Sequence, residues 1–503
     1  MLTTSSQLAK AAATRATCES NRQQTTAPSA ATQTTASSAT PKKRSITTDY
    51  KWTGKFAPFT HQKATAEFLT LNRKAFCFNE QGTGKTASVI WAADYLMKLG
   101  LIKRVLLICP LSIMKSAWQA DLFKFAMHRS CEVAYGSPKK RRDIIAQGSE
   151  FVIINFDGVE IVKNELLVSG FDLIVVDEAS AYKNAQTTRW KVLRDLCGHV
   201  KGLWMLTGTP AAQSPVDAYG LAKLINPDNT PKFYGQFRDQ VMYKVGMYRW
   251  LPKSNAQTTV HKVLQPAIRF EKKDCLDLPE LTYVERDAPL TSQQMKFYKL
   301  LKERMTMVAA GEEVSAVNAA TNINKLLQIS GGAVYSDTGE VVEFDVSNRL
   351  KVVHEVIDEA SHKVLVFVPF THTIELLREY LEKHHITCDV INGKVPVNRR
   401  HEIINDFQTT DKVRVLIIQP QAASHGLTLT EANVVIWYAP VTSVETYLQA
   451  NARINRPGQR NPMTVVHVTG SDVEARLYKM LSTNINNHEK LIDLYRKEIT
   501  NTP

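Results

Sequence analysis

Short, mostly apolar runs alternate with longer amphipathic stretches along most of the chain, from Trp52 onward. Runs of this length, separated by helical stretches, are typical of parallel strands buried on both faces of a sheet. The first set of predicted strands comprises Ala75–Phe78, Val105–Cys109, Phe151–Asn155, Leu173–Val176 and Leu203–Leu206. The second set comprises Val364–Val368, Cys388–Ile391, Val413–Ile418, Val434–Tyr438 and Val465–Val468. The pattern therefore predicts an α/β protein with two parallel sheets.

Residues 1–48 differ in composition from the rest of the chain. Ser, Thr and Ala fill 29 of these 48 positions, and six basic residues accompany a single acid, Glu19. No aromatic residue precedes Tyr50, so the segment lacks the residues to bury a core. We predict a disordered tail. The alternative is an organelle transit peptide, which is also rich in Ser and Arg and poor in acids, and Lys42–Arg44 is too short a basic run to establish a nuclear signal.

The length of 503 residues is enough for about three domains at roughly 150 residues each. The two sets of strands indicate a tail at 1–48, a first lobe at 49–227, a connector with helices at 228–289, a second lobe at 290–490 and a C-terminal tail at 491–503.

Composition and charge narrow the class of protein. Apolar residues make up 44% and charged residues 22%, which is ordinary for a soluble globular protein. The apolar runs fall far short of the roughly 20 residues that a membrane helix needs, so we expect no membrane partner. The net charge of 62 − 49 = +13 suits a phosphate backbone or an acidic membrane surface, although charge alone does not exclude a generically basic protein. The seven cysteines are scattered without a CxxC pair, which predicts reduced thiols and no zinc site.

The first chemical motif is the sequence NEQGTGKT at residues 79–86, between a predicted strand and a predicted helix. A phosphate needs backbone N–H groups that approach it closely, which explains the glycines. Lys85 would neutralise the β- and γ-phosphates, and the Thr86 hydroxyl would hold Mg²⁺. The full pattern G-x-x-x-x-G-K-[ST] requires glycine at position 79, where this chain has Asn79. The predicted nucleotide-binding residues of this loop are Gly82, Thr83, Gly84, Lys85 and Thr86.

The second motif is the pair Asp177 and Glu178, directly after a predicted buried strand. A parallel strand that ends in two acids places them at the ligand crevice of the sheet. Asp177 would bind Mg²⁺, and Glu178 would orient and deprotonate the attacking water.

The third motif contains Arg453 and Arg456, which are three residues apart and would share one face of a helix. Pro457 would end that helix at or before Arg456. Two arginines at a helix end in the second lobe favour arginine fingers, which would stabilise charge on the transferring phosphoryl group.

Taken in order, these motifs resemble those of the Swi/Snf-type ATPases of helicase superfamily two, over roughly residues 52–480. The most specific similarity is QANARINRPGQ at residues 449–459, close to the family pattern QAxxRxHRxGQ. Further similarities are the adenine-reading motif at 59–62, the first DNA-contact motif at 107–112 with Trp118, the DEAH-like element at 177–180 with Lys183 and Asn184, the coupling motif at 206–210 and motif five at 426–430. Ser180, Asn455 and Asn433 depart from the family, which usually has His, His and Asp there, and Ser180 puts the coupling of ATP to DNA in doubt.

The resemblance implies two tandem RecA-like lobes that bind ATP and Mg²⁺ in the cleft and step along nucleic acid. It implies that Gln62 and Gly426 belong to the nucleotide site. It also implies contacts with DNA phosphates, for which the candidates are Ser112, Lys115, Thr371, Asn392 and Ser424.

The sequence is compatible with three functions. The leading one is a DNA-dependent ATPase that translocates on duplex DNA without necessarily separating its strands. The second is a strand-separating helicase on DNA or RNA, and the third is a nucleic-acid-binding scaffold that has kept the fold. The compact size is similar to that of small viral and bacterial members, so we expect a cytoplasmic location in a bacterial or virus-infected host cell.

Overall fold

The computed structural model describes residues 44–52, 57–208, 210–211, 214–245, 250–311, 316–335, 341–423 and 428–483. Most of the predicted N-terminal tail and all of the predicted C-terminal tail lie outside these ranges. The predicted end of the N-terminal tail at residue 48 was too late, because helix α1 (Ile46–Asp49) belongs to the compact unit that begins at Ser45. Ile46 is buried, and Ser45 caps the helix by accepting a hydrogen bond from the backbone of Thr47.

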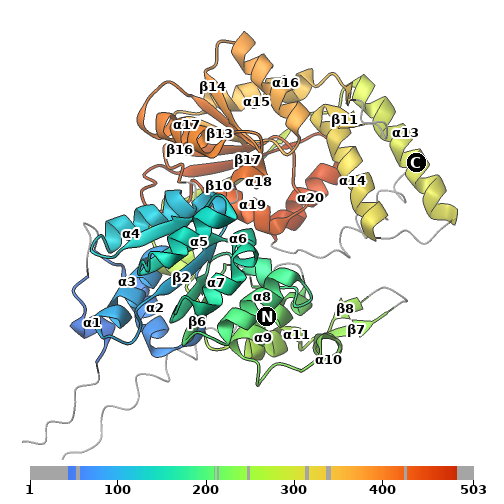
Figure 1. Cartoon of the computed structure of the whole chain (residues 1–503). Helices are drawn as coiled ribbons and strands as arrows, with labels where there is room; N and C mark the ends of the chain where they lie inside the picture. Colours follow the sequence, from blue (N-terminus) through green and yellow to red (C-terminus); the bar gives the residue numbers. More distant parts are fainter. Residues whose placement is uncertain are drawn as a thin grey trace, which may run out of the picture. The chain divides into compact units, whose positions relative to one another are not determined.

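The first sheet has seven parallel strands in the order β3-β4-β2-β5-β6-β1-β9. Its strands are β1 (Lys74–Cys77), β2 (Val105–Cys109), β3 (Cys131–Ala134), β4 (Phe151–Asn155), β5 (Leu173–Val176), β6 (Gly202–Leu206) and β9 (Ala267–Ile268). Figure 1 labels β2 and β6 among the helices of the first lobe. The five strands predicted from apolar runs are present, and β3 and β9 are additional.

Helices cover both faces of this sheet. Along β2, Leu106 and Ile108 belong to one apolar cluster, whereas Val105 and Leu107 belong to another. Successive strand residues point to opposite faces, so both sets are buried only if each face is covered. One cluster includes residues of α2 (Thr60–Leu71), α3 (Lys85–Lys98) and α4 (Ala120–Phe125). The other includes residues of α5 (Pro138–Ala146), α6 (Phe156–Ile161), α7 (Lys163–Val168), α8 (Thr188–Cys197) and α9 (Ala218–Ile225).

The second sheet has six parallel strands in the order β10-β17-β16-β13-β15-β14. Its strands are β10 (Leu281–Asp287), β13 (Lys363–Phe367), β14 (Cys388–Ile391), β15 (Val415–Ile418), β16 (Ala432–Trp437) and β17 (Met463–Thr469). Its helices are α15 (Ser347–Glu359), α16 (Thr371–Lys383), α17 (Val397–Thr409), α18 (Pro420–Ala423), α19 (Val444–Asn451) and α20 (Asp472–Ser482). Between β10 and α15 come α13 (Ser292–Gly311), α14 (Ala316–Gly331) and the antiparallel pair β11 (Ala333–Tyr335) and β12 (Val341–Glu343).

The segment 228–289, which we expected to be a connector with helices, also supplies strands to both sheets. It contains α10 (Tyr234–Val241), the antiparallel pair β7 (Met242–Lys244) and β8 (Trp250–Pro252), α11 (Ala256–Val263), β9, α12 (Lys272–Cys275) and β10. The strand β9 ends the first sheet and has only two residues. The strand β10 ends the second sheet, and its positions are half-exposed or exposed and partly charged. Neither edge strand carries the continuous apolar run that signals a buried strand.

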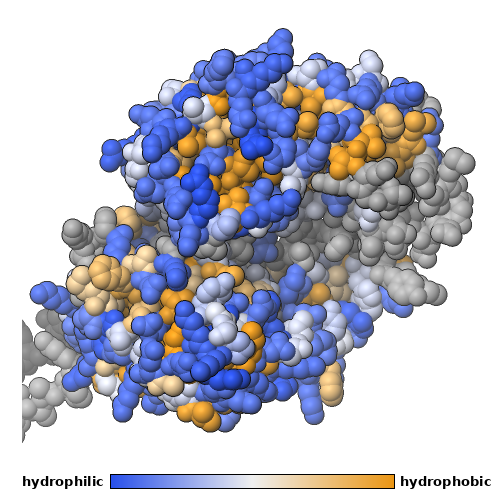
Figure 2. Space-filling view, turned by 45° about the horizontal axis from the view of Figure 1, so that its top comes forward, coloured by the Kyte–Doolittle hydropathy of each residue, from blue (hydrophilic) through white to orange (hydrophobic). Residues whose placement is uncertain are grey.

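The remaining general expectations concern membranes and cysteines. Among the described residues, no helix is both long and apolar enough to cross a membrane. Hydrophilic residues dominate the face shown in Figure 2, and hydrophobic residues form smaller patches between them. The six cysteines in the described ranges are all free thiols, and those ranges contain no cluster of three or more potential metal ligands among His, Cys, Asp and Glu.

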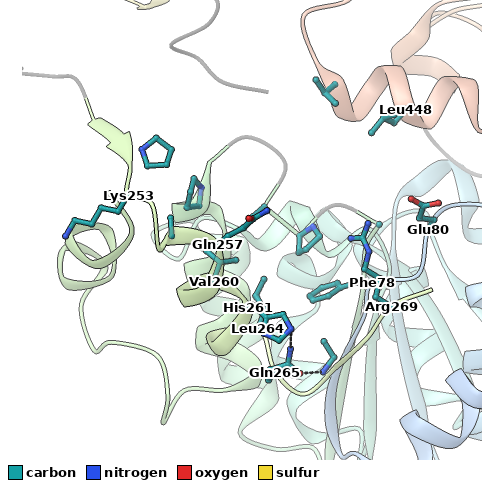
Figure 3. A pocket seen from close by; sticks show the side chains of 18 of the residues that line it. Phe78, Glu80, Lys253, Gln257, Val260, His261, Leu264, Gln265, Arg269 and Leu448 are labelled. Carbon is teal, nitrogen blue, oxygen red and sulfur yellow. Dashed lines mark hydrogen bonds between the residues drawn. The ribbon is translucent and has the colours of Figure 1, made fainter. Parts of the chain in front are cut away.

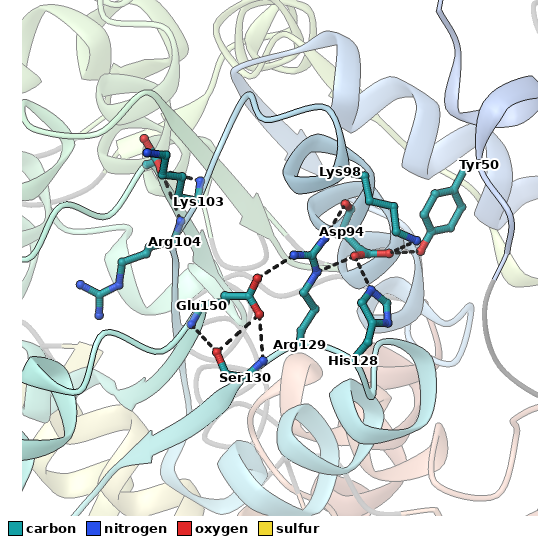
Figure 4. Close-up of polar contacts among 10 residues, drawn as sticks. Tyr50, Asp94, Lys98, Lys103, Arg104, His128, Arg129, Ser130 and Glu150 are labelled. Atoms are coloured by element: carbon teal, nitrogen blue, oxygen red, sulfur yellow. Dashed lines mark hydrogen bonds and ion pairs between the residues drawn. The ribbon is translucent and has the colours of Figure 1, made fainter.

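The buried carboxylate of Asp94, on helix α3, forms hydrogen bonds with side chains from the segments packed around that helix (Figure 4). It accepts hydrogen bonds from the Tyr50 hydroxyl at 2.6 Å and Arg129 Nε at 2.7 Å, and from His128 and Lys98 at 2.9 Å. Burial by itself would raise the pKa of Asp94, but these four donors outweigh it and lower the pKa to about 2.

Replacing Asp94 by alanine is expected to lower the free energy of unfolding by about 3 kcal/mol at pH 7, because it removes the buried acceptor of four donors and leaves the mostly buried Arg129 with Glu150 as its remaining carboxylate. Tyr50→Phe removes one hydrogen bond of the same network and should cost about 1 kcal/mol. Because the folded pKa lies below the unfolded value, Asp94 stabilises the protein above about pH 4, and this contribution is lost as the pH falls toward 2. Urea denaturation at pH 7 and near pH 2 measures these effects. Equal stability of Asp94→Ala and wild type at pH 7 would contradict them.

Candidate active site

The loop formed by the NEQGTGKT motif at residues 79–86, called the phosphate loop from here on, connects the end of β1 to the start of α3, as the sequence predicted. Gly82 and Gly84 have φ angles of 87° and 77°, a left-handed conformation that glycine adopts without strain. Gly84 also lies against α2, because a Cβ at this position would come within 2.1 Å of the Gln62 side-chain nitrogen. The two glycines therefore let the loop turn tightly under a neighbouring helix.

Lys85 is the first residue of α3, and its ammonium bends back over the loop. Its Nζ donates hydrogen bonds to the carbonyl oxygens of Asn79 at 2.8 Å and Glu80 at 3.2 Å. The ammonium is thus held at the mouth of the loop, where it would meet the phosphates.

Gln62 and His61, on the first turn of α2, form hydrogen bonds with the backbone of the phosphate loop. The carbonyl of Thr83 accepts hydrogen bonds from His61 Nε2 at 2.8 Å and from Gln62 Nε2 at 3.4 Å. Gln62 Oε1 accepts from the backbone N–H of Phe59 at 3.0 Å. Thr83 is buried and its hydroxyl donates to the carbonyl of Glu80, so its side chain supports the loop from within.

Asp177 and Glu178 follow β5 at the carboxyl edge of the first sheet. The carboxylate of Asp177 accepts hydrogen bonds from Trp118 Nε1 at 2.9 Å and from the backbone of Glu178 at 3.0 Å. Glu178 has a left-handed backbone with φ of 50°, which is uncommon for a residue other than glycine and is typical of functional sites. Burial, together with the neighbouring charge of Asp177, raises the pKa of Glu178. A carboxylate with a raised pKa is a stronger base toward a water molecule.

Arg453 and Arg456 do not share a helix face, because α19 ends at Asn451 and both arginines lie in the turns that follow it. The buried Arg453 donates from Nε to the carbonyl of Gln449 at 2.8 Å. Arg456 donates from Nε to the carbonyl of Ala452 at 2.8 Å and from Nη1 to the Thr428 hydroxyl at 3.3 Å. Backbone carbonyls therefore hold both guanidinium groups in place without a continuous helix.

A cavity of about 620 Å³ brings the three motifs together. Residues predicted for the nucleotide site that line it are Gln62, Gly82, Gly84, Lys85, Thr86, Asp177, Glu178, Arg453 and Arg456. Gly426 and Ser424 lie outside the described residues. Motifs that are separated by more than 350 positions thus converge on a single cavity, whose lining contains both cations and carboxylates.

The donor set of this cavity fits Mg²⁺. The ion is usually held by one or two carboxylates together with water and substrate phosphates. Asp177 and Thr86 both line the cavity, and burial raises the pKa of Asp177, as expected for a carboxylate that lacks a full counter-charge. Thr86 and Asp177 would hold the ion, which would supply positive charge to the phosphates.

A second cavity, of about 730 Å³, lies beside the end of strand β1 (Figure 3). Phe78 and Glu80 after β1, Arg269 after β9, and His261 and Gln265 in and after α11 line it. It shares no lining residue with the cavity that contains the motifs. Without Lys85 or the acidic pair, it has no means of activating a phosphate, so we place the chemistry in the first cavity.

Of the candidate DNA-contact residues, the four that the structure describes do not line the first cavity, and their role remains a prediction. Ser112 belongs to the short helix η1 (Leu111–Ile113), and the exposed Lys115 belongs to η2 (Met114–Gln119). Thr371 begins α16. Asn392 is buried, and its side-chain oxygen accepts a hydrogen bond from the backbone of Lys394, so it also shapes a turn after β14.

Three groups have contacts at or near the site that the sequence did not predict. Trp118, assigned by resemblance to a DNA-contact motif, is fully buried and holds the carboxylate of Asp177. Ser180, where the family usually has histidine, donates to Glu445 of α19 at 3.1 Å, a contact between the two lobes. The side chain of Lys272 reaches the phosphate loop from the connector. Trp118 and Ser180 both lie in motifs that are recognisable in the sequence, whereas Lys272 had no sequence signal.

Comparisons with known proteins agree with this geometry. Residues 61–330 match the family of the SNF2-related domain, and residues 348–458 match the helicase conserved C-terminal domain. Since the first match covers more than half of the chain, the protein belongs to the SNF2-related family and carries the two domains of a helicase-like ATPase. The predicted family and the α/β fold with two parallel sheets are thereby confirmed.

The chain is similar to several curated proteins and solved structures. It is 26% identical over 427 residues to the mouse chromodomain-helicase-DNA-binding protein 1-like, covering 81% of this chain and 46% of the relative. It is 24% identical over 443 residues to an uncharacterized ATP-dependent helicase of Mycoplasma genitalium, covering 83% of this chain and 42% of the relative. The chain thus spans less than half the length of these relatives. The SWI2/SNF2 ATPase core of Sulfolobus solfataricus in complex with dsDNA is 22% identical, with a TM-score of 0.43, and 86% of this chain and 92% of that one are covered.

Proposed function

We propose that the protein hydrolyses ATP in the first cavity and uses the cycle to move along duplex DNA. The observation that carries the proposal is the convergence of Lys85, the acidic pair and the two arginines on one cavity. A scaffold that only retained the fold would have no need to keep all five groups in position. The net charge of +13 supports a nucleic acid as the track.

The residues of this chain divide the hydrolysis between them. Lys85 and the backbone N–H groups of the loop bind the β- and γ-phosphates. Glu178 orients a water molecule whose oxygen attacks the γ-phosphorus, and its carboxylate accepts the proton as the bond to the β–γ bridging oxygen breaks. Arg453 and Arg456 neutralise charge on the transferring group from the side of the second lobe. Mg²⁺, held by Thr86 and Asp177, would add positive charge to the phosphates.

Movement along DNA would follow from the position of the arginines. They belong to one lobe, whereas Lys85 and Glu178 belong to the other, so the site is complete only when the two lobes approach each other. The contact of Ser180 with Glu445 offers a second link between the lobes, next to the acidic pair. Contacts to DNA should go mainly to phosphates, and the preference for sequence should therefore be weak.

Steady-state ATPase rates with duplex DNA, single-stranded DNA and RNA test this function. We expect duplex DNA to stimulate hydrolysis most, and the motor to displace a third strand from a triplex without unwinding the duplex. Greater stimulation by a single strand, together with unwinding, would instead support a strand-separating helicase. No hydrolysis with any of the three would support a scaffold.

We also propose a cytoplasmic location, based on the reduced thiols that the cysteine spacing predicts. Microscopy of a fluorescent fusion, with and without residues 1–48, distinguishes this from targeting by the tail.

A further inference from the structure

The segment from Pro266 to Cys275 runs alongside strand β1 and the first residues of the phosphate loop. Its strand β9 pairs with β1 in parallel. Beyond this pairing, the backbone N–H of Phe78 donates to Ile268 at 2.8 Å, and that of Glu80 donates to Phe270 at 3.0 Å. The segment therefore continues alongside the loop after the strand has ended.

Two loop side chains fix the segment in this position. Asn79 Oδ1 accepts a hydrogen bond from the backbone N–H of Phe270 at 3.0 Å, and its Nδ2 donates to the Thr65 hydroxyl at 2.8 Å. Glu80 Oε2 accepts from the backbone N–H of Lys272, at the start of α12, at 2.9 Å. Asn79 is the position at which the full phosphate-loop pattern has glycine, and a glycine could make neither contact. The departure from the pattern thus serves to hold Lys272 near the loop.

The side chain of Lys272 extends over Gly82. Its Cε lies 3.5 Å from the point where a Cβ of Gly82 would be, and Cγ of Arg456 lies 3.4 Å from the same point. Its Nζ donates to the carbonyl of Asn455 at 2.9 Å. Lys272 therefore lies between the phosphate loop and the turn that carries Arg456.

The charges around Lys272 favour an anion. Burial and the nearby charges of Arg456, Lys85 and Arg453 lower the pKa of Lys272 to about 8, and only Glu80 acts in the opposite direction. Four cations that repel one another around the phosphate loop are stabilised together when a polyanion binds there. The phosphate chain of a nucleotide is such an anion, and the loop under Lys272 is the part of the fold that would bind it.

We propose that Lys272 binds the phosphate chain of the nucleotide, as a further cation beside Lys85 and the two arginines. This proposal rests on the proposed function and deepens it. Because the same ammonium bonds the carbonyl of Asn455, a phosphate that attracts Lys272 also alters the contact that holds the Arg456 turn. The connector would in this way couple nucleotide binding at the phosphate loop to the position of the Arg456 turn in the second lobe.

Binding of fluorescent ATP to the full chain, with competition by unlabelled ADP, tests the proposal without requiring hydrolysis. Lys272→Met removes the charge at nearly constant length, and we expect it to weaken ATP and ADP binding roughly ten- to hundredfold. Lys273→Met is the matched control, because the exposed Lys273 pairs with Glu271 and should leave affinity unchanged. Lys272→Arg keeps the charge and should restore most of the affinity. Thermal unfolding of each variant shows whether it is folded.

The pH dependence of binding provides a readout that a purely structural lysine would not affect. The free wild-type protein loses the charge of Lys272 above about pH 8, so its affinity for ATP should fall about tenfold between pH 7 and pH 9. The Lys272→Arg variant should not show this decline, while Glu80, Lys85, Arg453 and Arg456 are the same in both proteins.

Wild-type affinity in Lys272→Met, or identical pH profiles for wild type and Lys272→Arg, would overturn the assignment of Lys272. Failure of the proposed function has a different signature, a wild-type protein that binds ATP but does not hydrolyse it in the presence of DNA. In that case the affinities would still decide the role of Lys272.

Discussion

Lys85→Ala is expected to abolish ATP hydrolysis while the protein remains folded. Its ammonium donates to the backbone carbonyls of Asn79 and Glu80 and lines the cavity, so its removal leaves the apolar core intact. Fixed charge at the site of reaction is the largest single contribution in many enzymes, and we expect a loss of about 10²-fold or more in kcat.

The measurement is steady-state ATPase activity with saturating duplex DNA, alongside circular dichroism. Lys191→Ala, which changes an exposed lysine on α8, is the matched control and should behave as wild type. Undiminished turnover of Lys85→Ala would remove the phosphate loop from the mechanism.

Local patterns in the sequence were sufficient to place the phosphate loop and the acidic pair. Both motifs directly follow a buried strand, and in a parallel sheet that position determines the edge at which they lie. Lys85 and Glu178 line one cavity for this reason, although they are 93 positions apart. The same reasoning gave the five buried strands of the first sheet, whose residues are apolar on both faces.

Groups that depend on contacts between distant segments could not be predicted in this way. The predicted helix through Arg453 and Arg456 was wrong, because backbone carbonyls accept hydrogen bonds from their side chains where the helix has already ended. The connector was assigned helices because an edge strand such as β10 is half-exposed and carries charged residues. The position of Lys272 depends on the pairing of β9 with β1, which joins segments about 190 residues apart and leaves no periodic signal.

The departure of Asn79 from the general phosphate-loop pattern, and those of Ser180 and Asn455 from the family motifs, can be interpreted only with the structure. Asn79 replaces a glycine and ties Phe270 to the loop. Ser180 replaces a histidine, and its shorter side chain still contacts the second lobe through Glu445. Asn455 also replaces a histidine, and its backbone carbonyl, which any residue would provide, accepts the hydrogen bond from Lys272. Asn79 and Ser180 therefore make these contacts through their side chains, whereas Asn455 makes its contact with Lys272 through the backbone.

Arg456→Lys is expected to bind ATP and DNA nearly normally and to lose most DNA-stimulated hydrolysis. Glu178 can position water but cannot neutralise charge on the γ-phosphoryl group, and Lys85 neutralises only part of it. Arg456 lies against Gly82 of the phosphate loop and is oriented by Ala452 and Thr428. Arginine fingers contribute on the order of 10³–10⁵ to the rate in other phosphoryl-transfer enzymes. Lysine retains the charge but not the planar fork, so it should not restore the rate.

Arg453→Lys should behave in the same way, with a greater loss of stability because Arg453 is almost fully buried. Arg460→Lys is the matched control, since Arg460 is exposed just beyond the same turn and should leave the rate unchanged. Steady-state ATPase activity with saturating duplex DNA is compared with nucleotide binding by fluorescence and with thermal unfolding. Loss of hydrolysis with retained binding would show that the second lobe completes the site when the lobes approach. Wild-type rates in both lysine variants would instead mean that the arginines only stabilise the turns after α19, and hydrolysis would then have to proceed within the first lobe alone.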